Sequence, residues 1–130
     1  MEEVNRRLEV CHPDNPAFGA VELVMLYEKV DRLNARDIVI SRAGGIDRSP
    51  CGAGTGARVT DLFTKEKLKM DEEYCLESFL GTQFVGRVLE ALDVGSFRGA
   101  LPEIRGSPYI TGKHRFILEP GDPLLEELVV

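Results

Sequence analysis

The sequence predicts an α+β fold with several short strands and one central helix. A β-branched run at Ile38–Ile40 and an apolar run at Val21–Tyr27 are typical of strands. Apolar residues recur at helical spacing between Thr55 and Lys67. After residue 100, short apolar stretches alternate with Gly and Pro, a pattern typical of strands joined by tight turns.

The first third of the chain predicts two strands. Leu8–Cys11 is a short apolar stretch that ends in a turn at His12–Pro16, a segment rich in Pro, Asp and Asn. Val21–Tyr27 is almost continuously apolar, so we expect a buried strand there. A charged connection, Glu28–Asp37, leads to the second strand at Ile38–Ile40.

The middle of the chain predicts the helix, over Thr55 to about Lys67. Three lysines near its C-terminal end complement the helix dipole: Lys65, Lys67 and Lys69. The residues expected on its buried side are Ala57, Leu62 and Phe63.

The second half of the chain predicts further strands. The periodicity of Phe84–Leu92 also fits a helix, but Gly86 within this segment favours a strand. The other expected strands are Tyr74–Leu80, Ala100–Ile104, Ser107–Thr111 and Lys113–Leu118.

The composition indicates one globular domain and excludes several classes of protein. The chain has 130 residues, enough for one core, and no apolar run long enough to span a membrane. Its net charge of −6, without a basic stripe, argues against binding to nucleic acid. The first residues lack the basic and apolar pattern of a secretion signal, so we expect a cytoplasmic protein.

The cysteines do not form a disulfide or zinc pattern. There are three of them, without CxxC spacing, and two distant histidines are too few for a metal centre. We therefore expect no metal site. Cys11 and Cys75 lie among strand-like residues, where we expect them to be small buried hydrophobes.

Cys51 has the setting that can activate a thiol. It stands at the start of a glycine-rich turn, directly before the predicted helix. Peptide N–H groups in such a turn stabilise a thiolate, so we expect a lowered pKa for Cys51, and the same groups can hold a substrate carboxylate. A thiolate beside a carboxylate site suits proton abstraction from an amino acid Cα. A turn that only joins a strand to a helix is the simpler alternative.

The segment Asp47-Arg48-Ser49-Pro50-Cys51-Gly52-x-Gly54-Thr55 resembles the second-cysteine signature of the proline racemase family, which also contains hydroxyproline epimerases and 3-hydroxyproline dehydratases. Other segments match the family in the same order. They are His12-Pro13, Ser78-Phe79-Leu80-Gly81-Thr82-x-Phe84-x-Gly86-Arg87-Val88, Pro102-Glu103-Ile104-Arg105-Gly106, Tyr109-Ile110-Thr111-Gly112 and Asp122-Pro123. The resemblance covers nearly the whole chain.

The resemblance implies a β-rich lobe wrapped around a helix, of the diaminopimelate-epimerase type, with residues 1–130 as a single C-terminal-type lobe. It also implies cofactor-independent inversion of proline or hydroxyproline by two cysteines, one as base and one as acid. Cys51 matches the second cysteine. Gly52 and Ala53 match the positions whose N–H groups hold the substrate carboxylate, and Asp47 matches the residue that meets the substrate amine.

Two departures from the family pattern affect the prediction. Ala53 replaces a usual Thr, which keeps the backbone donor and loses a hydroxyl. The Met-Cys-Gly-His motif of the partner cysteine is absent from this sequence. We therefore expect a second lobe, either on another chain or from a second copy of this chain, to complete the site. Leu124–Val130 is a candidate interface strand.

Two classes of function remain open at this level. The first is a racemase or epimerase, favoured over a dehydratase because dehydratases of the family commonly have Thr at the position of Cys51. The second is a non-catalytic lobe that binds a carboxylate or a partner. A redox-sensing thiol is a third possibility, although Cys51 has no resolving cysteine nearby.

Overall fold

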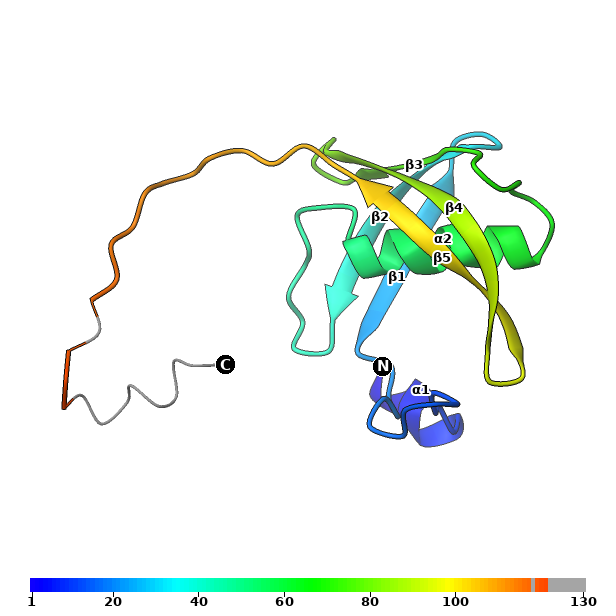
Figure 1. Cartoon of the computed structure of the whole chain (residues 1–130), viewed down its shortest axis with the longest axis horizontal. Coiled ribbons are helices and arrows are strands. Elements are labelled where there is room, and N and C mark those ends of the chain that lie inside the picture. The colour runs from blue at the N-terminus through cyan, green and yellow to red at the C-terminus, as the bar shows by residue number, and fades with distance from the viewer. Residues whose placement is uncertain (118, 122–130) are drawn as a thin grey trace.

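The computed structural model describes residues 1–117 and 119–121, and it confirms an α+β fold. Figure 1 shows one sheet with a helix packed across it. The elements are α1 (Glu2–Arg7), β1 (Leu23–Lys29), β2 (Asn34–Ser41), α2 (Gly52–Thr64), β3 (Tyr74–Ser78), β4 (Gln83–Val94) and β5 (Phe97–Arg105). Neither helix of the described part is long and apolar enough to cross a membrane.

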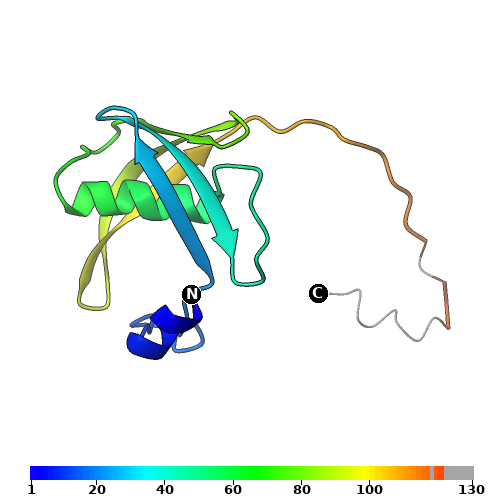
Figure 2. The ribbon, with the colours of Figure 1, turned by 180° about the vertical axis from the view of Figure 1, so that it is seen from behind.

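The strands follow one another in chain order across the sheet, from β1 to β5. All neighbours are antiparallel except β2 and β3, which are parallel and are joined by α2 as a crossover helix. The helix therefore begins near the carboxyl end of β2. In Figure 1 strands β4 and β5 pass in front of α2, and in Figure 2 strands β1 and β2 do so. The sheet thus curls around the helix.

The core lies between α2 and the centre of the sheet. It contains Val59, Leu62 and Phe63 of α2 together with Ala35, Leu68, Tyr74, Leu76 and Val88. Gly86 of β4 permits this close packing, because a Cβ there would lie 2.9 Å from Val59 Cγ1. Leu62 and Phe63 are buried as predicted, whereas Ala57 is exposed. Ala57 lies on the opposite side of α2 from the buried Val59 and Leu62.

Three strand predictions were wrong in part. The described residues of Ser107–Thr111 and Lys113–Leu118 contain no strand, and Leu118 lies outside the described residues. Figure 1 shows this segment, in orange, running away from the sheet, where no described strand lies beside it to pair with its backbone. Phe79 and Leu80 belong to a turn after β3 rather than to the strand. Strand β4 confirms the strand assignment of Phe84–Leu92.

The N-terminal part also differs from the prediction. Strand β1 is half-exposed rather than buried, because it is an edge strand with only β2 beside it. Cys11, which we expected to be buried, is exposed in the turn that follows α1. Cys75 is half-buried in β3, where burial raises the pKa of its thiol. The candidate interface strand Leu124–Val130 lies outside the described residues.

Candidate active site

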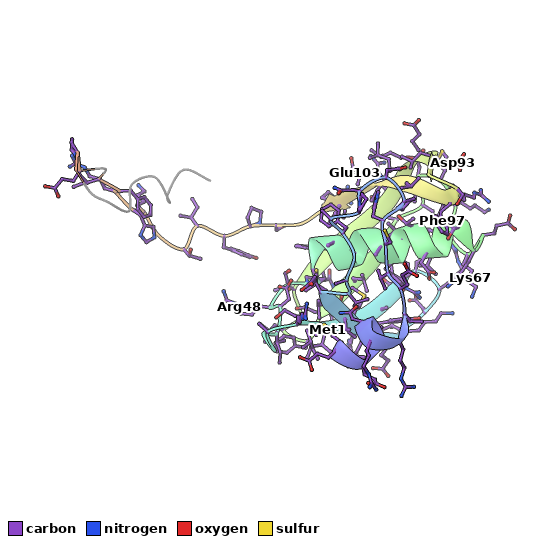
Figure 3. All side chains as sticks on the ribbon, turned by 90° about the horizontal axis from the view of Figure 1, so that it is seen from below. Met1, Arg48, Lys67, Asp93, Phe97 and Glu103 are labelled. Carbon is purple, nitrogen blue, oxygen red and sulfur yellow. The ribbon has the colours of Figure 1, made fainter. Side chains whose placement is uncertain are left out.

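The loop before α2 is fixed to β2 by backbone pairing. Ile46 forms an isolated bridge with Ile40, and the Asp47 N–H donates to the Val39 carbonyl at 2.9 Å. This pairing returns the chain along β2, so that α2 begins above the sheet. Figure 3 shows Arg48 of this loop and Lys67 toward opposite ends of α2.

Asp47 and Cys51 are connected through Ser49. Asp47 Oδ1 accepts hydrogen bonds from the N–H and the hydroxyl of Ser49, both at 2.9 Å. Ser49 Oγ in turn accepts the Cys51 N–H at 3.1 Å. These bonds hold one carboxylate oxygen of Asp47 and orient the peptide that leads into the helix. The structure therefore brings Asp47 and Cys51 together, as the sequence predicted.

Cys51 is the N-cap of α2 and has an unusual backbone conformation. Its φ of 61° lies in the left-handed region, which costs a non-glycine residue on the order of 1 kcal/mol or more. Its Sγ accepts the Gly54 N–H at 3.4 Å, and its carbonyl accepts the N–H and the hydroxyl of Thr55, each at 2.8 Å. The residue is 6% exposed. The two hydrogen bonds from Thr55, which is itself fully buried, hold Cys51 in this strained backbone conformation.

Gly52 and Ala53 occupy the first two positions of α2, and both are exposed. N–H groups at these positions have no carbonyl partner within the helix, and the helix dipole places partial positive charge there. They can therefore hold an anion such as a carboxylate. The carboxylate-binding role that the family resemblance implies for these two residues stays a prediction.

Asp37 is a residue near the site that the sequence reasoning missed. It was assigned to the charged connection before the second strand, but it lies within β2 and is 4% exposed. Burial and then the negative charge of Asp47 raise the pKa of Asp37 from 3.8 to about 6. The available signal was the alternation of Ala35, Asp37 and Val39, which places all three on one face of a strand.

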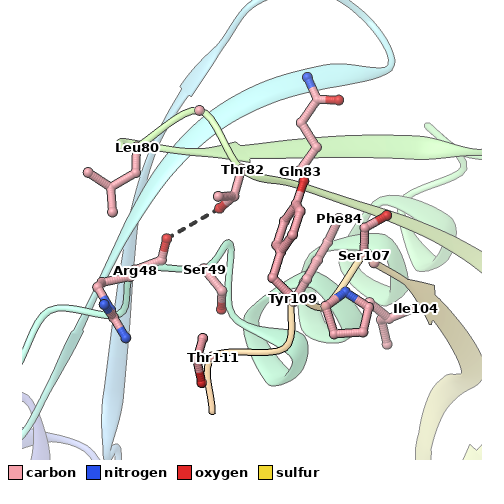
Figure 4. Close-up of a pocket in the computed structure, with 13 residues that line it drawn as sticks. Arg48, Ser49, Leu80, Thr82, Gln83, Phe84, Ile104, Ser107, Tyr109 and Thr111 are labelled. Atoms are coloured by element: carbon pink, nitrogen blue, oxygen red, sulfur yellow. Dashed lines mark hydrogen bonds between the residues drawn. The ribbon is translucent and has the colours of Figure 1, made fainter.

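One hollow lies beside the first turn of α2, and another lies beside the loop that precedes it. A groove of about 450 Å³ between β1 and α2 is lined by Ala53 and Gly54 together with Met25 and Tyr27 of β1. A larger cavity of about 960 Å³ lies on the other side of the loop, next to Arg48 and Ser49. Figure 4 shows Tyr109 and Ser107 of the extended segment beside Phe84 in this cavity, and Thr82 donating to the Arg48 carbonyl.

The other candidate side chains do not join this site. Cys75 lies between Tyr74 and Leu76, which face the core, and Cys11 lies in the N-terminal turn. His12 Nδ1 accepts the Asp14 N–H at 3.1 Å, a structural contact within its turn. Within residues 1–117 and 119–121, no three His, Cys, Asp or Glu side chains gather to form a metal site.

Comparison with known proteins identifies the family. The sequence model of the family described as proline racemase matches residues 1–128. The chain is 43% identical to a proline racemase of Acetoanaerobium sticklandii over 93% of its own length and 37% of that protein. It is 38% identical to a 4-hydroxyproline 2-epimerase of Shewanella loihica over 94% of its own length and 37% of that protein.

A solved structure agrees with the sequence comparison. A hydroxyproline epimerase from Agrobacterium vitis, crystallised with bound trans-4-hydroxy-L-proline, superposes with a TM-score of 0.80 at 31% identity. The superposition covers 95% of this chain and 36% of that one. The chain thus spans little more than a third of the length of the relatives it matches, and it belongs to the proline racemase family.

Proposed function

We propose that this chain contributes one half of an active site that inverts the Cα of proline or hydroxyproline without a cofactor. The observation that carries the proposal is the start of α2. There a cysteine thiol, two exposed helix N–H groups and an aspartate joined through Ser49 lie within the seven residues from Asp47 to Ala53. This arrangement can bind the carboxylate and the amine of one amino acid with a thiol beside its Cα.

The proposed reaction needs a base on one face of Cα and an acid on the other. One thiolate removes the Cα proton, and the thiol on the opposite face delivers its proton to the resulting carbanion. Cys51 is one of these two groups, and it exchanges roles with its partner when the substrate has the opposite handedness. The charge that develops toward the carboxylate is stabilised by the N–H groups of Gly52 and Ala53.

The second thiol must come from outside this sequence. We propose that residues 1–130 form a single C-terminal-type lobe of the diaminopimelate-epimerase kind, and that a second lobe supplies the missing cysteine. The extended segment after β5 supports a partner, because its apolar side chains are largely exposed, Tyr109 by 85% and Ile110 by 92%. A lobe with the Met-Cys-Gly-His motif is the first choice, and a second copy of this chain is the alternative.

Solvent isotope exchange tests the proposal. The chain, together with its completing lobe, is incubated in D₂O with L-proline or 4-hydroxy-L-proline, and deuterium at Cα is measured. We expect incorporation with the native sequence and its loss in Cys51→Ser. The variant Cys75→Ser is the matched control, because Cys75 lies in β3 away from the loop. Absence of exchange with every proline analogue would refute the proposal.

A lobe that only binds is the second candidate function. It is favoured by the low exposure of Cys51 and by Ala53 in place of the usual Thr. It predicts that L-proline binds without exchange at Cα, and that Cys51→Ser binds as tightly as the native chain. A loss of exchange without a loss of affinity in Cys51→Ser would instead show that the thiol serves in chemistry.

A further inference from the structure

A carboxyl group without a hydrogen-bond partner lies beneath the candidate site. Asp37 is 4% exposed, and neither of its oxygens has a hydrogen-bond partner among the described residues. It lies on the face of β2 that also carries Ala35 of the core and Val39, which lines the groove with Ala53 and Gly54. A buried carboxylate without a donor is costly, so its presence near a ligand site indicates a compensating role.

The surroundings of Asp37 contain one group that affects its charge. The titratable or polar groups on the elements packed against it are Tyr27 of β1, Ser78 of β3, Asp47 of the loop, and Cys51 and Arg58 of α2. Arg58 lies over the Tyr27 ring at 4.1 Å and pairs with Asp61 at 3.2 Å. Ser78 bonds to Thr82 at 2.7 Å. Only Asp47, apart from burial, contributes to the raised pKa of Asp37.

Asp37 and Asp47 differ in the hydrogen-bond donors that stabilise their negative charge. Asp47 Oδ1 has two donors from Ser49, whereas Asp37 has none. A positive group bound at Asp47 would therefore relieve the unpaired charge of Asp37 as well. A proline-like amino acid carries such a group, its secondary ammonium.

We propose that Asp37 is a positioning residue for the substrate amine, which places a second negative charge behind Asp47 and so strengthens the hold on the ammonium group. This inference rests on the function proposed above, in which Asp47 meets that amine. Asp37 does not touch the substrate, because both its oxygens are shielded from solvent. It acts through its electric field, which is weakened less in a buried setting than in water.

The role makes substrate binding dependent on pH. The ammonium group favours the ionised form of Asp37, so binding releases the proton that Asp37 holds at low pH. The pKa of Asp37 is about 6 in the free chain. The affinity for the substrate amine therefore decreases as the pH falls through this value and Asp37 becomes protonated.

Carbon NMR of the side-chain carboxyl groups in the full chain, together with its completing lobe, tests the inference directly. The Asp37 resonance is assigned by its absence in Asp37→Asn, and we expect its midpoint near pH 6. The midpoint should fall in Asp47→Asn and stay unchanged in Asp93→Asn, a matched control on the exposed end of β4. Saturating L-proline should lower it, whereas cyclopentanecarboxylate, which has a similar ring and carboxylate without the amine, should not. A midpoint that L-proline does not lower, or that both compounds lower equally, would overturn the inference.

Kinetics of the completed enzyme provide the second readout. We expect KM for L-proline to rise about tenfold in Asp37→Asn at pH 8, the effect of one nearby charge, with little change in kcat. KM of the native sequence should rise as the pH falls through 6, and that of Asp37→Asn should not. If no deuterium enters Cα but L-proline still lowers the Asp37 midpoint, the proposed catalysis fails and this inference stands. If deuterium enters Cα but L-proline leaves the Asp37 midpoint unchanged, the proposed catalysis stands and this inference fails.

Discussion

The two sides of α2 differ in how closely the sheet packs against them. On the side of β4, Thr55 and Val59 are fully buried against Gly86, with no room for a further methyl group. On the side of β1, a groove of about 450 Å³ separates the helix from a half-exposed edge strand. The closed side holds the helix, and with it Cys51, in a fixed position. The open side leaves the first turn of α2 accessible to a ligand or a partner lobe.

The largest expected effect comes from the closed side. Leu76→Ala should lower the free energy of unfolding by about 2–5 kcal/mol, because Leu76 is fully buried and the change leaves a cavity. Leu23→Ala is the matched control on the open side, where Leu23 is 44% exposed, and should cost less than about 1 kcal/mol. Urea unfolding of both variants measures the difference. Equal losses would contradict the contrast between the two sides.

Glycine substitutions probe the same contrast at close range. Gly86→Ala should destabilise by about 1–3 kcal/mol, because the new Cβ would meet Val59 and Thr55 within 3.1 Å. Gly52→Ala meets nothing within 4 Å and should leave stability the same or slightly higher. Thermal unfolding distinguishes the two. A stable Gly86→Ala variant would show that α2 can move away from β4.

Buried Asp37 makes the free energy of unfolding depend on pH. The folded-state pKa of Asp37 is raised to about 6, so the folded chain holds this proton more tightly than the unfolded chain. The contribution of protonated Asp37 to the free energy of unfolding is fully present below pH 3.8. It is lost as the pH rises through 6. Asp37→Asn should therefore gain about 1–3 kcal/mol relative to the native chain between pH 4 and pH 8. A difference that does not vary with pH would contradict the assignment.

The smallest effect is expected at the edge of the open side. The Arg58 guanidinium lies 4.1 Å from the centre of the Tyr27 ring, which is half-exposed. Tyr27→Leu should lower the free energy of unfolding by about 0.5–1 kcal/mol, since it removes the aromatic face. Tyr27→Phe should lower it less, because this variant keeps the aromatic face. Chemical unfolding measures both. Equal losses in the two variants would show that the ring face contributes little.

The sequence could predict the features of this chain that depend on neighbouring residues. Asp47, Cys51, Gly52 and Ala53 lie in one loop and the turn that follows, so their order along the chain already places them together. The helix and the strand that contains Gly86 were predicted for the same reason. The resemblance of this loop to the family signature then led to the prediction that it forms one half of a two-cysteine site.

The features that the sequence did not predict depend on distant partners. Residues 107–117 have strand-like composition, but a strand also needs a neighbour, and the described chain offers none beside them. The importance of Asp37 depends on its burial in β2 and on its nearness to Asp47, which follow from the pairing of the loop with β2. The edge position of β1 likewise follows from the order of the whole sheet.

Protection from alkylation tests the central claim, that Cys51 lies beside a site for a proline-like amino acid at the start of α2. The folded chain, together with its completing lobe, is treated with iodoacetamide with and without saturating L-proline, and each cysteine is followed separately by mass spectrometry. Cys11 in the N-terminal turn and Cys75 in β3 lie away from the loop and provide internal references. We expect L-proline to slow the alkylation of Cys51 and to leave the rates at Cys11 and Cys75 unchanged. An equal rate at Cys51 with and without L-proline would contradict the claim.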